Sequence, residues 1–555
     1  MRRREFVLGT ATLAAASVGV FDAGQRMTAR VEYPGRELGH WLREARVLPE
    51  PAETLDTEVL IAGGGVAGLT ALWQLGKRGV RDVLLVSGPE PHGNAAAGRD
   101  GALSFPTGAH YLPLPSMQSR HMRELLADFG VITANPYDER PVYDERYVVH
   151  GPSERVLYRG AWQDGYLPIE GVASAELAQH RRFFELVDHY SGARGSDGRR
   201  AFAVPLEFSS ADEGFVALDR MSFSAWLDQE GFTAPTLRWY LNYCCRDDYG
   251  RNHDEISAWA GLHYFCSRDG QAANAERGAV ITWPQGLAAL TSQLSATGAA
   301  RQSPWPRASV ARLASGADGV EALVLVWAGQ SPRAVRVRAR NVIAAMPLFI
   351  LQHVLADAAS YGFVPARDVP AYAPWLVSNF LLHAFPEERA GAALSWDNVI
   401  YQEAGLGYVV STHQDIRMSR PDRSAFTAYY ALSDMPPEAA RRWLDRASSA
   451  ELLSVASRDL RLAYGWRLPF CVDAVTITVR AHAMAIPGPG FLSSAGRLAL
   501  RNAAGPIYFA HSDLSGLSLF EEAAWWGYRA ATQIAPTPRT AVANRQRRGA
   551  VPHLA

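Results

Sequence analysis

The sequence predicts an α/β protein in which a Rossmann-type domain is interleaved with an α+β domain, and two glycine-containing segments carry that prediction. The first, at 59–68, reads VLIAGGGVAG and leads into a helical pattern. The second, at 505–513, reads GPIYFAHSD and precedes a helix-like stretch that begins near Phe520. At 555 residues the chain exceeds the size at which one hydrophobic core keeps growing, so we expect two domains.

The first segment shows the order of buried strand, tight turn, helix and second strand that begins a dinucleotide-binding unit. Gly63 permits the tight turn, Gly65 lets backbone N–H groups approach a pyrophosphate, and Gly68 lets the helix pack closely on the strand. Apolar positions continue at helical spacing to residue 75, and 83–86 is the next buried strand. The residues that we assign to the phosphate-binding turn are Gly63, Gly64, Gly65, Ala67 and Gly68. The alternative is a glycine turn with a structural role only.

The acidic residue that usually ends the second strand of such a unit is absent, and Ser87 stands in its place. A serine hydroxyl makes single hydrogen bonds to a ribose and lacks the charge-assisted pair that a carboxylate forms with a diol. Glu90 substitutes for the missing acid if its loop folds back, and otherwise is an exposed loop carboxylate. We expect cofactor affinity to depend more on the pyrophosphate and on the far end of the cofactor.

Composition narrows the classes of partner. The net charge of −1 provides no broad basic field, which argues against nucleic acid or an anionic membrane surface as the main partner. The four cysteines do not form a disulfide framework, and no Cys/His group has metal-ligand spacing, so we predict buried thiols and no metal site. A hydrophobic content of 48% with 20% charged residues is ordinary for a globular enzyme.

The first 24 residues resemble a bacterial twin-arginine signal. Paired arginines at Arg2–Arg4 precede Phe6 and Leu8, and a weakly apolar run to Phe21 follows that is too short and too rich in alanine for a spanning helix. The resemblance implies export to the periplasm by the twin-arginine machinery, a route for proteins that are already folded. The alternative is the basic start of a cytosolic helix. We expect no stable membrane span beyond this signal.

Changes of pattern along the chain predict two interleaved domains. A polar, aperiodic leader precedes the first strand, and a helical, aromatic block begins near 116. Short strands near 310–313, 320–326 and 335–337 form a meander, and 341–346 is a buried strand that ends on a proline turn. The predicted segments are a signal at 1–24, a leader at 25–56, a cofactor domain at 57–115, 280–355 and 480–540, a substrate domain at 116–279 and 356–479, and a tail at 541–555.

From 57 to 535 the chain resembles the flavin-containing amine oxidase superfamily, which includes phytoene-desaturase-like enzymes. The motifs that carry the resemblance, in order, are Gly63-Gly65-Gly68, Gly108-Ala109-His110, Trp283-Pro284-Gln285-Gly286, Val310, Met346-Pro347, Tyr508-Phe509-Ala510, Asp513 and Glu522-Ala523. The resemblance implies FAD as cofactor. The chain departs from the family at Ser87, at Gly93-Asn94 where a Gly-Gly-Arg is usual, and at His511-Ser512-Asp513.

The resemblance also implies roles for single residues around the FAD. Val310 would meet the adenine through its backbone, and Asp513 would hold the ribityl-pyrophosphate region. The helix start at Glu522 and Ala523 would point amide N–H groups at the flavin N1–C2=O edge, where a helix N-terminus stabilises the negative charge of the reduced ring. Gly108 and Ala109 would pass close to the flavin, together with the residues that follow them.

Candidates for chemistry come from the same loop and from isolated histidines. By family position His110 and Tyr111 lie near the flavin, and His482 precedes the C-terminal motif. His263 and His413 are weaker candidates. For each histidine the alternative is a hydrogen-bonded structural role.

Two acidic pairs are candidates for recognising a cationic amine. They are Asp247-Asp248 and Asp397-Asn398. Since acids beside a glycine turn commonly cap or solvate a helix end, the bland alternative for Asp247-Asp248 is an exposed helix terminus. The pair Trp525-Trp526 is expected to pack in the C-terminal helix.

Together these features predict an exported FAD-dependent oxidoreductase of amine-oxidase type. It would take a hydride from an amine or another small organic molecule onto flavin N5, and the electron acceptor stays open. Two alternatives remain: a desaturase or isomerase of a long apolar substrate, which a hydrophobic tunnel would favour, and a flavin-binding protein without turnover.

Overall fold

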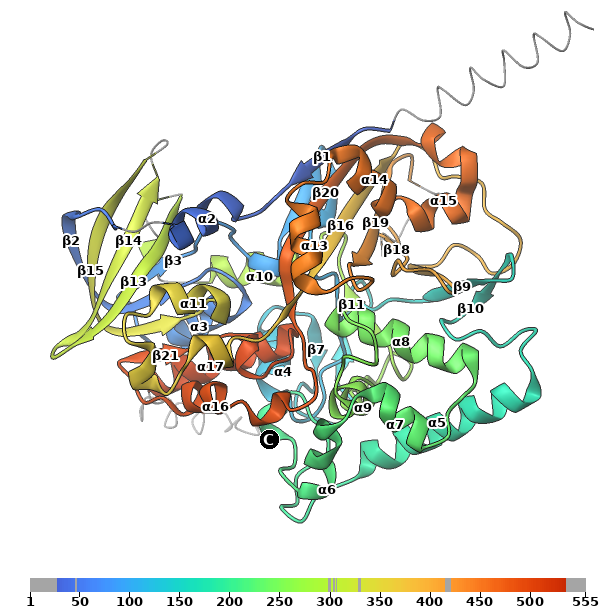
Figure 1. Cartoon of the computed structure of the whole chain (residues 1–555), viewed down its shortest axis with the longest axis horizontal. Helices are drawn as coiled ribbons and strands as arrows, with labels where there is room; N and C mark the ends of the chain where they lie inside the picture. Colours follow the sequence, from blue (N-terminus) through green and yellow to red (C-terminus); the bar gives the residue numbers. More distant parts are fainter. Residues whose placement is uncertain are drawn as a thin grey trace, which may run out of the picture.

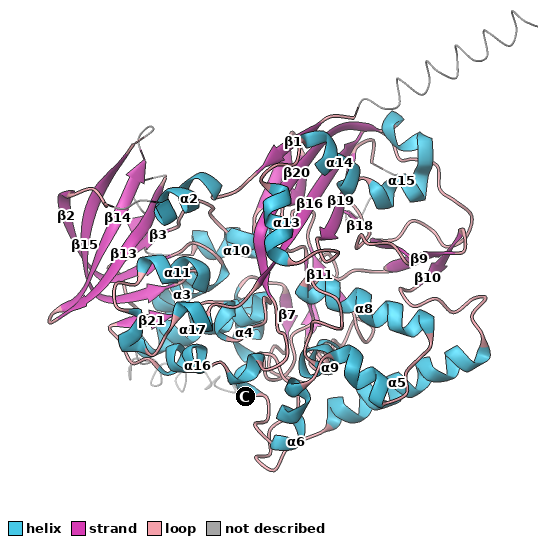
Figure 2. Cartoon of the chain, in the orientation of Figure 1, coloured by secondary structure: helices cyan, strands magenta, loops and turns pink. Residues whose placement is uncertain are grey.

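A computed structural model of the chain describes residues 27–44, 47–297, 301–302, 305, 307–327, 331–414 and 421–535. The predicted signal at 1–24 and tail at 541–555 lie outside the described residues. Figure 1 shows two β-sheets side by side, with helices packed below and around them. Figure 2 shows that the strands fall into two separate groups and that each group has helical cover.

The smaller lobe is built on a seven-stranded sheet in the order β12-β3-β2-β15-β14-β13, with β21 paired to β15. Its strands are β2 (Pro51–Ala62), β3 (Val83–Val86), β12 (Arg301–Gln302), β13 (Ala308–Gly316), β14 (Gly319–Trp327), β15 (Pro332–Ala344) and β21 (Ile507–Phe509). The pairs β12–β3, β3–β2, β2–β15 and β15–β21 are parallel. Strands β13, β14 and β15 form the antiparallel meander that the sequence predicts. The run 59–62 is at most 1% exposed, as expected for a parallel strand covered on both faces.

Three helices cover this sheet and position the ends of the cofactor motif. They are α3 (Val66–Lys77), α10 (Ala288–Ala296) and α17 (Phe520–Ile534), with α4 (Arg120–Asp128), α11 (Leu348–Val354), α12 (Pro365–Asp368) and α16 (Ala495–Asn502) further out. Helix α17 packs on α3, so two helices that lie more than four hundred residues apart in the sequence meet beside one sheet.

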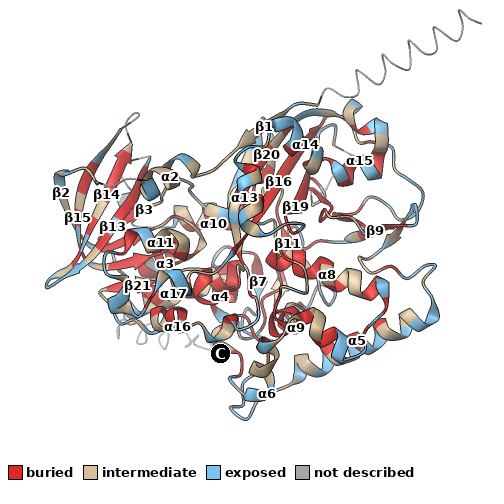
Figure 3. Ribbon diagram, viewed as in Figure 1, coloured by how far each residue is buried: buried red, intermediate tan, exposed pale blue. Residues whose placement is uncertain are grey.

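The larger lobe is built on an eight-stranded sheet in the order β1-β20-β16-β19-β18-β17-β9-β10. Its strands are β1 (Ala29–Glu32), β9 (Glu154–Tyr158), β10 (Ala161–Asp164), β16 (Tyr372–Leu382), β17 (Asp397–Ile400), β18 (Tyr408–Val410), β19 (Ser424–Ala431) and β20 (Val472–Ala485). Helices α13 (Pro437–Leu444), α14 (Ser449–Ala456) and α15 (Arg458–Tyr464) share one core with this sheet. Strands β16 and β19 are buried along their whole length (Figure 3).

A helical layer closes the other side of the larger lobe. It consists of α5 (Ser174–Gly192), α6 (Glu213–Val216), α7 (Phe223–Gln229), α8 (Pro235–Tyr249) and α9 (Ala258–Cys266). Short strands complete the fold: β4 (Ala97–Asp100), β5 (Leu103–Pro106), β6 (Tyr111–Pro113), β7 (Ile132–Ala134), β8 (Val142–Tyr143) and β11 (Val280–Thr282). In the described part of the chain, no helix has both the length and the apolar character that crossing a bilayer requires.

The predicted leader at 25–56 is wrong for part of its length. Residues 29–32 form β1, which pairs in parallel with β20, and α2 (Arg36–Glu44) follows. The first strand of the smaller lobe already begins at Pro51. A four-residue edge strand carries little periodicity of its own, and its pairing partner lies more than four hundred residues away, so local pattern did not reveal it. Likewise 480–485, predicted for the cofactor domain, continue β20 in the larger sheet.

Candidate active site

Three of the four glycines in the turn between β2 and α3 are packed so closely that a Cβ would not fit. Gly63 has φ of 126°, and a Cβ there would lie 2.1 Å from the Ala345 carbonyl oxygen. A Cβ on Gly64 would meet Ser87 at 2.6 Å, and one on Gly68 would meet the Gly63 carbonyl at 1.9 Å. At Gly65, the N-cap of α3, a Cβ would meet no heavy atom within 4 Å. The open side of the turn is therefore at Gly65, beside the free N–H groups of the helix start.

Helix α17 brings a second helix N-terminus to the same region. A Cβ on Gly527 would lie 2.0 Å from the Ala67 carbonyl oxygen, so the two helix backbones touch there. Gly527 is seven residues after Phe520, which places the start of α17 about 10 Å from the start of α3 along the α17 axis. Leu519, the N-cap of α17, provides no side-chain cap, so the first N–H groups of α17 remain open to a ligand.

The structure changes which backbone N–H groups at the start of α17 are free to meet a ligand. The N–H of Ala523 bonds to the Leu519 carbonyl within the helix at 3.1 Å, and the Glu521 carboxyl bonds to its own backbone N–H, so the open N–H groups are those of Phe520 and Glu522. The Glu522 carboxylate accepts from the Leu206 N–H at 2.6 Å and from the Ser515 hydroxyl, and it is fully buried. Its side chain thus braces the helix start, while its backbone N–H stays available.

The start of α17 forms one wall of a large cavity between the two lobes. The cavity encloses about 1170 Å³ of empty space, part of it open to solvent. Its lining includes Asn94, Gly108, Ala109, His110, Tyr111, Asp247, Asp248, His263, Tyr264, Arg268, Trp375, Tyr429, Leu519, Phe520 and Glu521. The predicted residues Gly108, Ala109, His110 and Tyr111 therefore do lie together at one cavity wall.

The wall that adjoins Tyr111 carries an ionic cluster that includes Asp247 and Asp248, the pair for which the sequence left open amine recognition and an exposed helix end. Asp247 and Asp248 lie in the last turn of α8, and both line the cavity. Arg268 forms an ion pair with Asp248, donates to the Tyr111 hydroxyl at 3.3 Å and sits 4.0 Å over the Tyr264 ring. The exposed-terminus alternative for Asp247-Asp248 is therefore wrong, because Asp248 is buried and both residues line the cavity.

Burial favours the protonated, neutral form of the carboxyl groups on this wall. Burial, and next the charge of Asp248, raises the pKa of Asp247 to about 7, although Arg268 opposes the shift. Burial also raises the pKa of Asp248, and Arg268 is the main opposing influence. On the α17 side, burial raises the pKa of Glu521 to about 7. Asp247 is hydrogen-bonded by the Tyr111 side chain and forms no ion pair among the described residues, so an incoming cation could pair with this carboxyl.

His110 is a neutral imidazole at physiological pH. Burial lowers its pKa to about 3, and its ring stacks on Tyr429 with 4.6 Å between ring centroids. Its Nε2 is buried and has no hydrogen-bond partner in the described structure, so a polar ligand group would have a partner there. Tyr111 adjoins the same wall, and burial raises the pKa of its hydroxyl above its ordinary value.

Behind Asp247 lies a second layer of acidic groups. Asp397 accepts from the Tyr166 hydroxyl at 2.9 Å, and burial, followed by the charge of Asp247, raises the pKa of Asp397 to about 8. Glu154 pairs with Asp397 across β9 and β17, and burial raises its pKa to about 7. These carboxyls share one region with few cations, so they retain protons near neutral pH.

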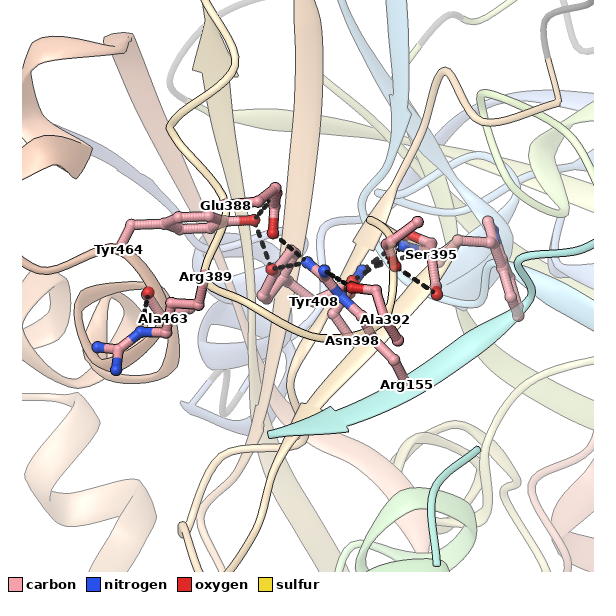
Figure 4. A network of polar contacts seen from close by, with 11 residues as sticks. Arg155, Glu388, Arg389, Ala392, Ser395, Asn398, Tyr408, Ala463 and Tyr464 are labelled. Atoms are coloured by element: carbon pink, nitrogen blue, oxygen red, sulfur yellow. Dashed lines mark hydrogen bonds and ion pairs between the residues drawn. The ribbon is translucent and has the colours of Figure 1, made fainter. Parts of the chain in front are cut away.

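Strand β17 is fixed from its other face by a buried arginine. Arg155 is fully buried; it donates to Asn398 at 2.6 Å and to Glu388 at 2.8 Å, and lies 3.9 Å over the Trp162 ring (Figure 4). Tyr464 donates to the other Glu388 oxygen at 2.9 Å. Since neighbouring residues of a strand point to opposite faces, this network holds Asn398 while Asp397 faces the cavity side.

Three predicted cofactor or catalytic residues lie away from the cavity. Val310 is buried at a bulge of β13. Asp513 is 1% exposed and accepts from the Leu348 N–H at 2.9 Å and from the Tyr372 hydroxyl, so it braces α11. His482 stacks on Phe349 with 4.5 Å between ring centroids and is absent from the cavity lining. The structure therefore does not bring His482 to the cavity; the role of Val310 stays a prediction.

Sequence reasoning missed Glu521, Arg268 and Arg480. The first-turn position of Glu521 beside Glu522 was a usable signal, whereas nothing local marked Arg268 or Arg480. The structure also shows contacts of Ser87 and Glu90 that the sequence did not reveal. Ser87 packs on Gly64, and Glu90 forms an ion pair with Arg480 at 2.8 Å. Within the described residues no group of three or more His, Cys, Asp or Glu has a metal-binding arrangement.

Comparison with known proteins agrees with this fold. Residues 61–129 match the family model of the NAD(P)-binding Rossmann-like domain. No curated protein matches the sequence. Among solved structures, wild-type putrescine oxidase bound to putrescine is similar with a TM-score of 0.60 and 16% identity, covering 87% of this chain and 99% of that one.

Two further structures share the architecture. Cyclohexylamine oxidase from Brevibacterium oxydans IH-35A has a TM-score of 0.58 and 18% identity, covering 87% of this chain and 99% of that one. A CLA-producing fatty acid isomerase from P. acnes has a TM-score of 0.54 and 15% identity, covering 86% and 98%. The chain thus has a mixed α/β fold with a Rossmann-like domain, as predicted, and shares it with these enzymes.

Proposed function

We propose that the protein is an FAD-dependent oxidoreductase that removes a hydride from an amine substrate. The observation that carries the proposal is the pair of helix N-termini without side-chain caps, α3 and α17, which lie about 10 Å apart along α17 in two helices that touch at Ala67 and Gly527. That separation suits the ribityl chain that joins a flavin ring to its diphosphate. Each helix start would then stabilise negative charge: α3 that of the diphosphate and α17 that of the reduced ring.

The residues of this chain fit such a cofactor. The space beside Gly65 is open while Gly63, Gly64 and Gly68 are packed, which is the pattern expected where a phosphate approaches the backbone. Gly93 lies against Gly65, since a Cβ there would be 3.6 Å from the Gly65 Cα. Asn94, next along the chain, lines the cavity, so one short loop runs from the phosphate-binding turn to the cavity wall. FAD, when bound, supplies the hydride acceptor.

The cavity residues would bind and orient the amine. Asp247, whose pKa lies near 7, would pair with the ammonium or accept its proton, because an amine loses hydride from its carbon only as the free base. Neutral His110 and the aromatic rings of Tyr111 and Tyr429 would pack against the substrate and exclude water. Glu521 stands at the start of α17, on the side where the flavin ring would lie.

The alternative desaturase or isomerase of a long apolar substrate receives less support. The similarity to a fatty acid isomerase concerns the fold. A cavity that carries Asp247, Asp248, Arg268 and Glu521 is costly to fill with a hydrocarbon chain, because these groups would lose hydration. We further propose export by the twin-arginine route, on the sequence of residues 1–24.

A visible spectrum followed by anaerobic reduction tests the proposal. The purified protein is expected to show oxidised-flavin absorbance, and a panel of polyamines, aromatic amines and amino acids is expected to contain a compound that bleaches it. A flavin that no amine in the panel reduces would contradict the oxidoreductase assignment and favour a flavin-binding protein without turnover. A colourless protein that takes up no FAD would contradict the cofactor.

A further inference from the structure

Three large apolar side chains stand exposed along α15 and the 3-10 helix that follows it, Gly465–Phe470. Leu462, Trp466 and Phe470 are 39%, 65% and 46% exposed, and they recur every four residues. We call these three residues the Trp466 patch. Single exposed apolar residues are ordinary on a protein surface, but Trp466 and Phe470 share one short helix, and Leu462 lies near the end of α15, just before the break at Gly465. Three large exposed apolar side chains so close together in the sequence indicate an interaction surface.

The patch is held in place from beneath. Ala463, Tyr464 and Leu468 on the same segment are buried in the core of the larger lobe, so the helix cannot turn to hide the exposed side chains. The rings of Trp466 and Phe470 meet edge to face, with 6.0 Å between centroids. The two rings therefore form one continuous apolar surface.

Four arginines border the patch, and only two have acidic partners. Arg467 pairs with Glu387 at 3.0 Å, and Arg458 pairs with Glu403 at 2.8 Å. The other two use different partners: Arg389 donates to the carbonyls of residues 462 and 463, and Arg461 donates to the Ser457 hydroxyl. The surroundings are thus locally positive, although the whole chain carries a net charge of −1.

The N-terminal segment enters the structure at the same end of the molecule. Strand β1 runs parallel to β20 with Ala29 opposite Val475, and Met27 packs against the same core as Cys471 and Val472, the two residues after Phe470. Figure 1 shows β1, α14 and α15 at one end of the larger sheet. The preceding 26 residues, which carry Arg2–Arg4 and a weakly apolar run, are thus attached beside the patch.

We propose that the Trp466 patch docks the protein on a phospholipid surface. Trp and Phe rings favour the boundary between headgroups and acyl chains, and arginine guanidinium groups bind headgroup phosphates. The attached N-terminal segment, with its own arginines, would reach the same surface, and two weak anchors together hold a protein more firmly than one. A second copy of the chain is a poorer occupant, because a two-fold interface would set the bordering arginines of both copies against each other.

Co-sedimentation of the full chain with vesicles tests the proposal. Vesicles of phosphatidylcholine with phosphatidylglycerol are expected to carry down the wild type, and the double variant Trp466→Ser/Phe470→Ser is expected to bind at least tenfold more weakly. The matched control is Val364→Ser/Leu498→Ser, which removes two exposed apolar side chains from the other lobe and should bind as the wild type does. Arg461→Gln should weaken binding about fivefold with phosphatidylglycerol and little without it.

Three results would overturn the proposal. The first is that the wild type fails to bind the vesicles. The second is that the Trp466→Ser/Phe470→Ser variant binds as well as the wild type, which would mean that the N-terminal segment acts alone. The third is that size-exclusion chromatography without lipid shows a wild-type dimer that this variant converts to a monomer, which would make the patch an interface between copies. Flavin content and amine oxidation by the variant should equal those of the wild type, which separates this proposal from the proposed function.

Discussion

Arg480 on β20 reaches across from the larger sheet and forms a two-pronged ion pair with Glu90 of the smaller lobe, at 2.8 and 3.1 Å. The same guanidinium donates to the Thr107 carbonyl at 2.7 Å and to Asn94 at 3.1 Å. Its side chain is 6% exposed, and that of Glu90 is 23% exposed. One buried cation therefore joins the two loops that lead from the phosphate-binding turn to the cavity wall.

Replacing Arg480 with Gln should destabilise the fold by about 3 kcal/mol, because Glu90, which is 23% exposed, would lose its one ion-pair partner among the described residues. The measurement is the free energy of unfolding in urea. Arg333→Gln is the control, since its pair with Glu53 is 45% and 44% exposed and should contribute less than about 1 kcal/mol. Equal effects of the two substitutions would contradict the assigned role of Arg480. Glu90→Gln/Arg480→Gln should recover part of the loss.

Substitution of Asp247 should change substrate binding while leaving the cofactor in place. Asp247→Asn is expected to lower kcat/KM for a cationic amine by on the order of tenfold or more, the usual size of a charge-assisted hydrogen bond. In the wild type, kcat/KM should rise as pH passes through about 7, where Asp247 ionises, and this rise should be absent from the variant. Asp228→Asn, at an exposed ion pair, is the control. An unchanged pH profile in Asp247→Asn would refute the role of this carboxyl.

The buried carboxyls also predict how stability depends on pH. An unfolded Asp loses its proton near pH 4, whereas Asp397 in the folded protein keeps its proton up to about pH 8. Between these values the folded state binds more protons, so the free energy of unfolding falls as pH rises. Buried His110 and His263, with pKa values lowered to about 3 and 4 by burial, act oppositely below pH 6.5. Above pH 6.5 only the carboxyl contribution changes, so the free energy of unfolding should fall as the pH rises from 6.5 to 8.

Asp397→Asn isolates the contribution of one of these carboxyls. Because the amide cannot ionise, the free energy of unfolding of the variant should rise by about 2 kcal/mol relative to that of the wild type as the pH goes from 6 to 8. Thermal unfolding at a series of pH values measures this gain. A difference between the two proteins that stays constant across this range would show that Asp397 is already ionised in the folded state.

Much of the smaller lobe was predictable because its signals are local. The run at 59–62, the glycines after it and the strand at 83–86 follow one another in the chain, and the structure has β2, α3 and β3 there. The meander and the C-terminal helix were predictable for the same reason. Strand β1 was not, because its pairing with β20 depends on a partner in a distant part of the sequence.

The cavity was only half predictable. The loop from Gly108 to Tyr111 was identified, but for Asp247 and Asp248 the sequence left open amine recognition and an exposed helix end, because they end a helix next to Gly250. Helix α8 is buried on several sides, so its hydrophobic pattern does not reveal which face meets a cavity. The pairing of Arg268 with Asp248 and of Arg480 with Glu90 joins residues whose contact only the assembled fold creates.

The most direct test compares flavin content in Gly65→Val and Gly68→Val with that of the wild type. A Cβ at Gly65 would meet no heavy atom within 4 Å, and a valine there would fill the space of the diphosphate, so Gly65→Val should fold with little change in Tm and lose its flavin absorbance. Gly68→Val should lower the Tm, because its Cβ would collide with the Gly63 carbonyl. The account predicts one FAD per wild-type chain and a stable, colourless Gly65→Val protein. A Gly65→Val protein that carries a full complement of flavin would contradict it.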